Sequence, residues 1–198
     1  MYMNDFRLID VYKPSGGKVK VVKNPTPYEL IGQGMQGAVF KLSNKICVKI
    51  YPEKKHRIWE EEVLREAQKS PFFPKLYDSG ANYIVMEYVE GIPLGDYLKN
   101  KRTMPRELTK QIITLHKEME RLKFTDYDIY LRHFIVTNNK TIKVIDHVKS
   151  FKRNRPQPER LVKGLSKLGL LRSFSSQVKE IDYKTYTKWK KTIKKYLS

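Results

Sequence analysis

The sequence predicts an α+β fold with two lobes, the first rich in β-strands and the second mainly helical. In the first 89 residues, short apolar and β-branched runs such as 46–51 surround one helical pattern at 55–68. After Glu90-Gly91, apolar residues recur instead at spacings of three and four, most clearly in 105–123. We therefore expect an N-terminal extension at 1–24, a β-rich lobe at 25–89 and a reduced helical lobe at 90–198.

The strands of the first lobe are bounded by turns that contain glycine, proline, asparagine or aspartate. The expected strands are 6–12, 18–23, 29–31, 38–42, 46–51, 75–78 and 83–89. The helix at 55–68 places Trp59, Val63 and Ala67 on one stripe, and Pro71 and Pro74 follow its end. The first lobe is thus expected to consist of strands around a single helix.

The second lobe is organised around an amphipathic helix at 105–123. Its apolar residues follow each other at spacings of four, three, four and three: Leu108, Ile112, Leu115, Met119 and Leu122. Two short strands, 134–137 and 142–145, flank a polar turn and predict a hairpin. Further helices are expected at 94–100, 161–171 and 181–197, with a loop at 173–176.

Composition and length narrow the class of protein. A chain of 198 residues with 40% hydrophobic residues can bury a sizeable core and is not typical of a disordered protein. No apolar run approaches the ~20 residues that cross a bilayer, and the first residues lack the pattern of a secretory signal. One cysteine, Cys47, cannot form an internal disulfide. We expect a cytoplasmic protein without a transmembrane segment.

The formal charge of +19 is concentrated near the C-terminus. Residues 149–198 contain 15 Lys or Arg residues and three acids. Such a segment is typical of a surface that attracts nucleic acid, an acidic protein or an anionic membrane. It is equally typical of a solvated face in a lysine-rich protein. The charge alone therefore predicts only that a partner of this surface would be negatively charged.

The run from Gly32 to Val39 fits the pattern GxGxxGxV. Glycines allow backbone N–H groups to approach phosphate oxygens, because no side chain stands between them. A dinucleotide-binding turn would need a helix next, whereas the following residues alternate as in strands. This pattern favours a phosphate-covering hairpin; a plain hairpin with glycines in its turn is the alternative.

Lys49 lies inside the apolar strand after this turn. A buried ammonium is costly without a partner, so the lysine either reaches solvent or pairs with a carboxylate while its ammonium contacts phosphate. The helix at 55–68 offers Glu60, Glu61 and Glu62. Glu60 is preferred because apolar residues follow it at positions +3, +4 and +7, which places it on the packed face.

These features resemble a protein kinase, and the resemblance covers roughly residues 28–150. The turn, with Gly32, Gly34, Gly37 and Val39, resembles the glycine loop, and Cys47-Val48-Lys49 resembles the lysine strand. Cys47 stands where that family usually has an alanine over the adenine ring. The resemblance implies that ATP binds here, with Lys49 held by Glu60.

The segment 84–91 resembles the hinge between kinase lobes. By that match the carbonyl of Glu87 and the N–H of Val89 would bond to adenine, Met86 would line the back of the pocket, and Ile135 would form its floor. Taken alone, the same segment would be interpreted as an ordinary buried strand.

Residues 126–135 resemble the catalytic loop HRDxxxxN, and 144–148 resemble the strand that ends in DFG. The match implies that Asp128 orients the substrate hydroxyl and accepts its proton, and that Asp146 binds Mg²⁺. His133 occupies the place of the second metal-binding asparagine. Imidazole suits Mn²⁺ better than Mg²⁺, so the site is expected to use Mg²⁺ or Mn²⁺; the alternative is that His133 is a surface histidine with no role in metal binding.

Other departures from the family narrow the resemblance. Tyr127 replaces the usual arginine, His147-Val148 replaces Phe-Gly, and no APE motif follows. The resemblance is therefore to minimal atypical kinases of the RIO-like group and to small bacterial Ser/Thr kinase-like proteins.

The sequence thus predicts a two-lobed protein-kinase-like fold and an ATP-dependent phosphotransferase, foremost an atypical Ser/Thr protein kinase with a protein substrate. One alternative is a nucleotide-binding adaptor with little turnover that docks on RNA or an acidic protein. Another is a small-molecule kinase, which would need an open acidic pocket near Asp128.

Overall fold

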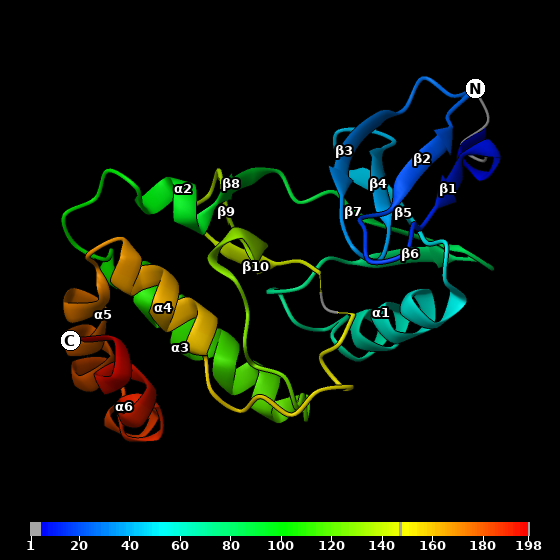
Figure 1. The fold of residues 1–198 in the computed structure, drawn as a ribbon. Helices are drawn as coiled ribbons and strands as arrows, with labels where there is room; N and C mark the ends of the chain where they lie inside the picture. The colour runs from blue at the N-terminus through cyan, green and yellow to red at the C-terminus, as the bar shows by residue number, and fades with distance from the viewer. Residues whose placement is uncertain (1–4, 147, 198) are drawn as a thin grey trace. The chain divides into compact units, whose positions relative to one another are not determined.

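A computed structural model of the chain, which describes residues 5–146 and 148–197, has the mixed helical and antiparallel β composition of an α+β protein (Figure 1). The predicted fold class is confirmed. The described residues divide into two compact units: one is formed by the residues up to Lys69 with Pro74–Glu90, the other by Ser70–Phe73 with the residues from Gly91 onward. His147 lies outside the described residues.

Among the described residues, the first unit contains two antiparallel sheets, one α-helix and a short 3₁₀ helix. Its larger sheet has the order β3-β4-β5-β7-β6, and a separate hairpin pairs β1 with β2. The strands are β1 (Asp10–Tyr12), β2 (Lys20–Lys23), β3 (Glu29–Gln33), β4 (Ala38–Lys41), β5 (Ile46–Ile50), β6 (Leu76–Ser79) and β7 (Tyr83–Glu87). The helix α1 (Lys54–Glu66) lies alongside β6 and β7.

Alternation along β5 divides the core of this unit into two clusters. Val48 and Ile50 join Phe40 and, from the first 24 residues, Phe6 and Val19. Cys47, whose side chain points to the other face of the sheet, belongs to a second cluster. That cluster also contains Tyr51, Leu64, Ile84 and Met86. The N-terminal segment therefore contributes to the hydrophobic core of the first unit, and the second cluster lies on the side of the sheet that α1 covers.

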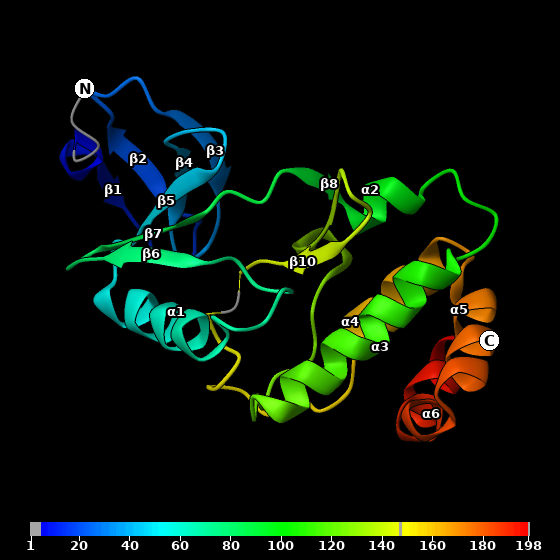
Figure 2. The same cartoon turned by 180° about the vertical axis from the view of Figure 1, so that it is seen from behind.

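In its described residues, the second unit combines a small sheet with five α-helices and the short 3₁₀ helix Leu131–His133. The sheet has the order β10-β9-β8 and consists of β8 (Gly91–Pro93), β9 (Phe134–Thr137) and β10 (Ile142–Val144). The helices are α2 (Leu94–Leu98), α3 (Arg106–Arg121), α4 (Glu159–Lys167), α5 (Leu171–Ile181) and α6 (Tyr183–Leu197). The helix α5 packs against α3, α4 and α6, and α6 also packs against α4; Figure 2 shows α5 and α6 beside each other at the C-terminal end of the chain.

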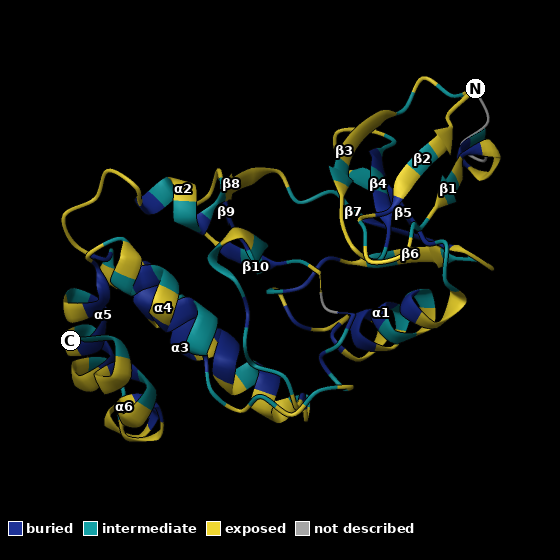
Figure 3. Ribbon diagram, viewed as in Figure 1, coloured by how far each residue is buried: buried dark blue, intermediate teal, exposed yellow. Residues whose placement is uncertain are grey.

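The apolar stripe predicted for α3 is buried, including Leu108, Ile112, Leu115 and Met119. In Figure 3 this buried face contrasts with α6, most of whose surface is exposed. On α6, only Thr185, Trp189 and Ile193 are buried among the described residues. Helical periodicity thus predicted four of the buried residues of α3, whereas Leu122 is half-buried after the end of the helix and Thr109, Ile113 and His116 are buried as well.

Two local predictions are wrong, and one strand was missed. The expected loop at 173–176 lies inside α5, because Phe174, Ser175 and Val178 are buried at helical spacing and Ser173 bonds to the backbone of Met104 and Leu170. The first half of the expected strand 6–12 is a short 3₁₀ helix, Asp5–Leu8. The strand β8 was not expected, since Gly91 and Pro93 are poor strand formers.

None of the helices in the described part of the chain is both long enough and apolar enough to span a bilayer.

Candidate active site

The glycine turn connects β3 to β4, and only one of its glycines is sterically required. A Cβ on Gly37 would lie 2.7 Å from the carbonyl oxygen of Ile50. A Cβ on Gly32 or Gly34 would meet nothing closer than 3.6 Å. Gly37 therefore permits close approach of the turn to β5, while Gly32 and Gly34 leave the turn without side chains where a ligand could approach.

The first 24 residues contact this turn. The N–H of Val19 donates to the carbonyl of Gly34 at 2.8 Å, and the Gln33 side chain donates to the carbonyl of Val19. These bonds connect the turn to a segment whose apolar side chains are in the core. No pattern in the sequence indicated this contact.

Lys49 and Glu60 form a buried ion pair between β5 and α1. Their side chains are 8% and 3% exposed, and Nζ of Lys49 lies 2.6 Å from Oε2 of Glu60. The hydroxyl of Tyr51 donates to the same oxygen at 2.8 Å. Burial strengthens this attraction but makes either charge costly without the other.

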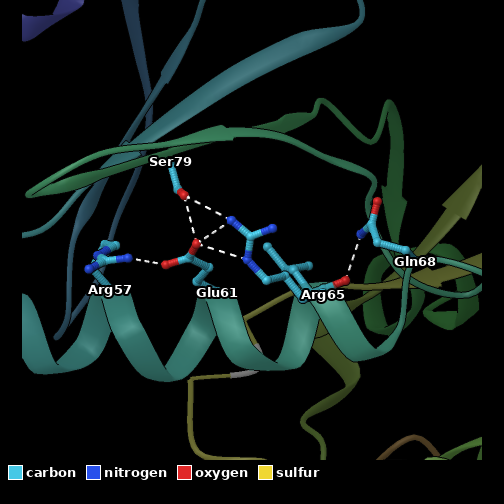
Figure 4. Close-up of polar contacts among 6 residues, drawn as sticks. Arg57, Glu61, Arg65, Gln68 and Ser79 are labelled. Atoms are coloured by element: carbon cyan, nitrogen blue, oxygen red, sulfur yellow. Dashed lines mark hydrogen bonds and ion pairs between the residues drawn. The ribbon is translucent and has the colours of Figure 1, made fainter.

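The neighbouring glutamates point elsewhere. Glu61 accepts bonds from Arg65 and from the Ser79 hydroxyl at 2.7 Å, and also pairs with Arg57 (Figure 4). Because Ser79 belongs to β6, this network fastens α1 to the edge of the sheet. Glu62 is exposed. Lys49 therefore pairs with the glutamate on the packed face of α1.

The residues expected around adenine in the first unit belong to one cluster. Cys47 and Met86 are buried together, and Val39 packs against them. Burial raises the pKa of the Cys47 thiol to about 12, and its Sγ lies 3.7 Å from the carbonyl oxygen of Glu87. Within the described residues, the N–H of Val89 has no hydrogen-bond acceptor.

Asp128, in the second unit, is bound to the start of α4. Its Oδ1 accepts the backbone N–H of Arg160 at 2.6 Å, and its Oδ2 lies 3.3 Å from the Arg160 guanidinium and 3.6 Å from that of Arg155. Asp126 in turn accepts the N–H of Asp128. Burial raises the pKa of Asp128 more than the two arginines lower it.

A cavity of about 780 Å³ opens beside Asp128. Four cations line it, from Arg155, Arg160, Lys163 and Lys167, along with the carboxylates of Asp128 and Glu159. Sequence reasoning missed Arg160, Lys163 and Lys167 as a group. Their spacing of three and four residues on one helix was the available signal.

His133 and Asp146 meet at the end of the small sheet. Nε2 of His133 lies 3.7 Å from Oδ2 of Asp146, and the Asp146 carboxylate is 36% exposed. Asp146 has a φ of 65°, a left-handed conformation that is costly for a residue with a side chain and is often found at functional sites. Ile135 is buried in β9 of the same sheet.

Across residues 5–146 and 148–197, no group of three or more His, Cys, Asp or Glu side chains could hold a metal ion. Asp146 and His133 offer two donors. Mg²⁺ is often held by one or two carboxylates together with substrate phosphates and water. The chemistry of this donor set fits a metal that arrives with a nucleotide.

Searches of known proteins give kinase matches. The chain is 26% identical over 141 residues to a Bacillus subtilis protein named "Putative serine/threonine-protein kinase YrzF", covering 69% of this chain and 66% of that protein. It is 31% identical over 144 residues to a "Probable serine/threonine-protein kinase" of Clostridium perfringens, covering 60% of this chain and 21% of that protein. It is 27% identical over 154 residues to the "Dual specificity protein kinase zakA" of Dictyostelium discoideum, covering 65% of this chain and 19% of that protein.

No family model matches the chain. The chain spans just under two thirds of the Bacillus protein and about a fifth of the other two. At this low identity, the three matches show a protein-kinase-like relationship.

Proposed function

We propose that this chain is an ATP-dependent phosphotransferase, and more specifically that it transfers the γ-phosphate of ATP to a Ser or Thr hydroxyl of a protein. The observation that carries the proposal is the buried Lys49–Glu60 pair, 2.6 Å long, on the strand that follows the glycine turn. A core can accommodate apolar residues at such positions at lower cost, so an ion pair there calls for a role beyond packing. The names of the kinase relatives support the same interpretation.

In this proposal, each unit supplies part of the chemistry. Gly32, Gly34 and Gly37 cover the phosphates with backbone N–H groups, and Lys49, held by Glu60, neutralises phosphate charge. In the first unit, adenine lies against Val39, Cys47 and Met86, with hydrogen bonds to the carbonyl of Glu87 and the N–H of Val89. That this N–H has no acceptor among the described residues supports the last assignment.

Asp128 orients the acceptor hydroxyl and receives its proton. The raised pKa of its carboxyl favours this role, because a stronger base accepts a proton more readily. Asp146, with His133 beside it, binds Mg²⁺ or Mn²⁺. The metal would neutralise charge on the transferring phosphate.

The proposal is tested with labelled ATP and a mixture of Ser/Thr proteins. We expect Asp128→Asn and Asp146→Asn each to reduce transfer of labelled γ-phosphate by about 10²-fold or more. The amide oxygen of Asp128→Asn can still accept the N–H of Arg160, so the fold should persist; unchanged melting curves check this. Undiminished transfer in both folded variants would reject the assignment.

A nucleotide-binding adaptor with little turnover is a second candidate. It is favoured by His133 at the place of a metal-binding asparagine and by the engagement of both Asp128 oxygens with α4. Thermal stabilisation by ATP with Mg²⁺ or Mn²⁺, without measurable transfer, would select it. The small-molecule alternative called for an acidic pocket near Asp128; among the charged residues that line the cavity found there, cations outnumber carboxylates, which counts against a cationic acceptor.

A further inference from the structure

We infer that the cavity beside Asp128 binds acidic side chains of the phosphoacceptor peptide, so that the enzyme prefers Ser or Thr next to Asp or Glu. This inference rests on the proposed phosphotransferase function. It adds the site and the residues that would select the substrate: Arg155, Arg160, Lys163 and Lys167.

The cavity adjoins the residue proposed to orient the acceptor hydroxyl. Asp128, the residue proposed to orient the acceptor hydroxyl, is itself part of the wall. A peptide whose hydroxyl lies at Asp128 therefore places its neighbouring residues in this cavity. A volume of about 780 Å³ is within the range of sites that enclose ligands, which leaves room for several side chains.

The residues that line the cavity carry excess positive charge. The single carboxylate of Asp128 pairs with both Arg155 and Arg160, and Glu159 is held by Lys195 at 2.5 Å and by the Tyr196 hydroxyl at 2.6 Å. Lys163 and Lys167 are exposed, and in the described part of the chain neither has a carboxylate within ion-pair distance. The cavity therefore has uncompensated positive charge, which favours an anionic ligand.

The arrangement of the cations favours an extended ligand over a single phosphate. Arg160, Lys163 and Lys167 form one stripe along α4, and seven residues of helix span about 10 Å. An extended peptide covers that distance in about three residues. We therefore expect the selected acids within about three positions of the acceptor residue.

Close packing holds this stripe beside Asp128. A Cβ on Gly164, between Lys163 and Lys167, would lie 2.6 Å from Cδ1 of Leu131. Leu131 follows Asp128 by three residues. The glycine thus lets α4 approach the segment that contains Asp128, which fixes the distance between the cations and the proposed acceptor position.

The test measures binding without ATP, so that it does not depend on phosphate transfer. Two short fluorescein-labelled peptides have one central serine, flanked by glutamates in one and by glutamines in the other. We expect the wild-type protein to bind the glutamate peptide roughly tenfold tighter at low ionic strength, as measured by fluorescence anisotropy. Lys163→Glu/Lys167→Glu should abolish this preference.

Lys190→Glu/Lys194→Glu is the matched control. It makes the same change of charge on exposed lysines of α6 that do not line the cavity, and it should keep the preference. If the two double variants lose the preference equally, or if neither loses it, the inference is overturned. If Lys163→Glu/Lys167→Glu unfolds, Lys163→Gln/Lys167→Gln replaces it.

Competition by inorganic phosphate and transfer of phosphate to the two peptides are measured as well. Displacement of the peptide by millimolar inorganic phosphate, with equal affinity for both peptides, would show a point-anion site and overturn the inference. Selective binding of the glutamate peptide without phosphorylation of its serine would uphold the site and reject the proposed transfer. Transfer to both peptides at equal KM, by contrast, would uphold the transfer and reject the site.

Discussion

The two units differ in the charge state of the ionisable side chains that they bury. The first unit buries a charged pair, Lys49 and Glu60, with both side chains under 10% exposed. The second buries His116, whose pKa is lowered to about 3 by burial, so that the ring is neutral at pH 7. It keeps the arginine partners of Asp128 in contact with solvent, with 37% and 26% of their side chains exposed.

The difference separates two kinds of site. A buried pair is organised before a ligand arrives, and each charge depends on the other. The Asp128 group borders a cavity, and its arginines can exchange partners when an anionic ligand enters. We therefore expect substitutions in the first unit to affect stability most, and substitutions around Asp128 to affect substrate use most.

The largest expected effect comes from Glu60→Ala, which leaves Lys49 buried without its main counter-charge. We expect a loss of about 3–5 kcal/mol in the free energy of unfolding, measured by urea denaturation. Glu66→Ala, at an exposed position of the same helix, should change it by less than about 0.5 kcal/mol. Lys49→Met/Glu60→Leu should recover much of the loss. Equal stability of the two single variants would contradict the comparison.

An intermediate effect on stability is expected from His116, because its protonation makes the free energy of unfolding depend on pH. The unfolded ring binds a proton below about pH 6.5, whereas the folded ring stays neutral down to about pH 3. Between these values the unfolded state binds more protons, so stability falls as the pH falls.

At pH 5 this difference in proton binding between the unfolded and folded states lowers the free energy of unfolding by about 2 kcal/mol. His116→Leu should therefore lose about 2 kcal/mol less than the wild-type protein between pH 7 and pH 5, as measured by urea denaturation at both values. Between pH 7 and pH 8 the two proteins should show the same change. Parallel curves down to pH 5 would mean that His116 does not make this contribution.

The smallest effect on stability is expected at Asp128. Asp128→Ala removes the acceptor for the N–H of Arg160 at the start of α4, and loss of such a cap costs about 1 kcal/mol. Because burial already disfavours the Asp128 charge, its half-buried arginine partners should not add to this loss. Thermal melting compares Asp128→Ala with Asp128→Asn, which keeps the acceptor. A loss as large as that of Glu60→Ala would remove the proposed contrast between the units.

Much of the fold could be predicted because its signals are local. The spacing of apolar residues in α3 placed Ile112 and Met119 in the core, and the apolar, β-branched run at 46–51 predicted the strand β5. The same logic preferred Glu60 as the partner of Lys49. These patterns depend on neighbours within a few residues, which the sequence displays directly.

The errors and omissions have a different origin. The serines at 173–176 suggested a loop because short polar side chains compete for backbone hydrogen bonds, but packing of Phe174 and Val178 keeps them in a helix. The bond from Val19 to Gly34 and the contacts of Arg155 and Arg160 with Asp128 join residues from 15 to more than 25 positions apart. No local pattern predicts which distant residues meet.

The α+β class, the strand–helix order around the glycine turn and the preference for Glu60 all follow from the sequence alone, because periodicity and steric rules act over a few residues. Tertiary packing was needed to show that Gly37 is the sterically required glycine of the turn. It was also needed to show that Asp128 caps α4 and that Lys163 and Lys167 line a cavity beside it. These features depend on close contact between segments far apart in the chain, where packing selects the partners.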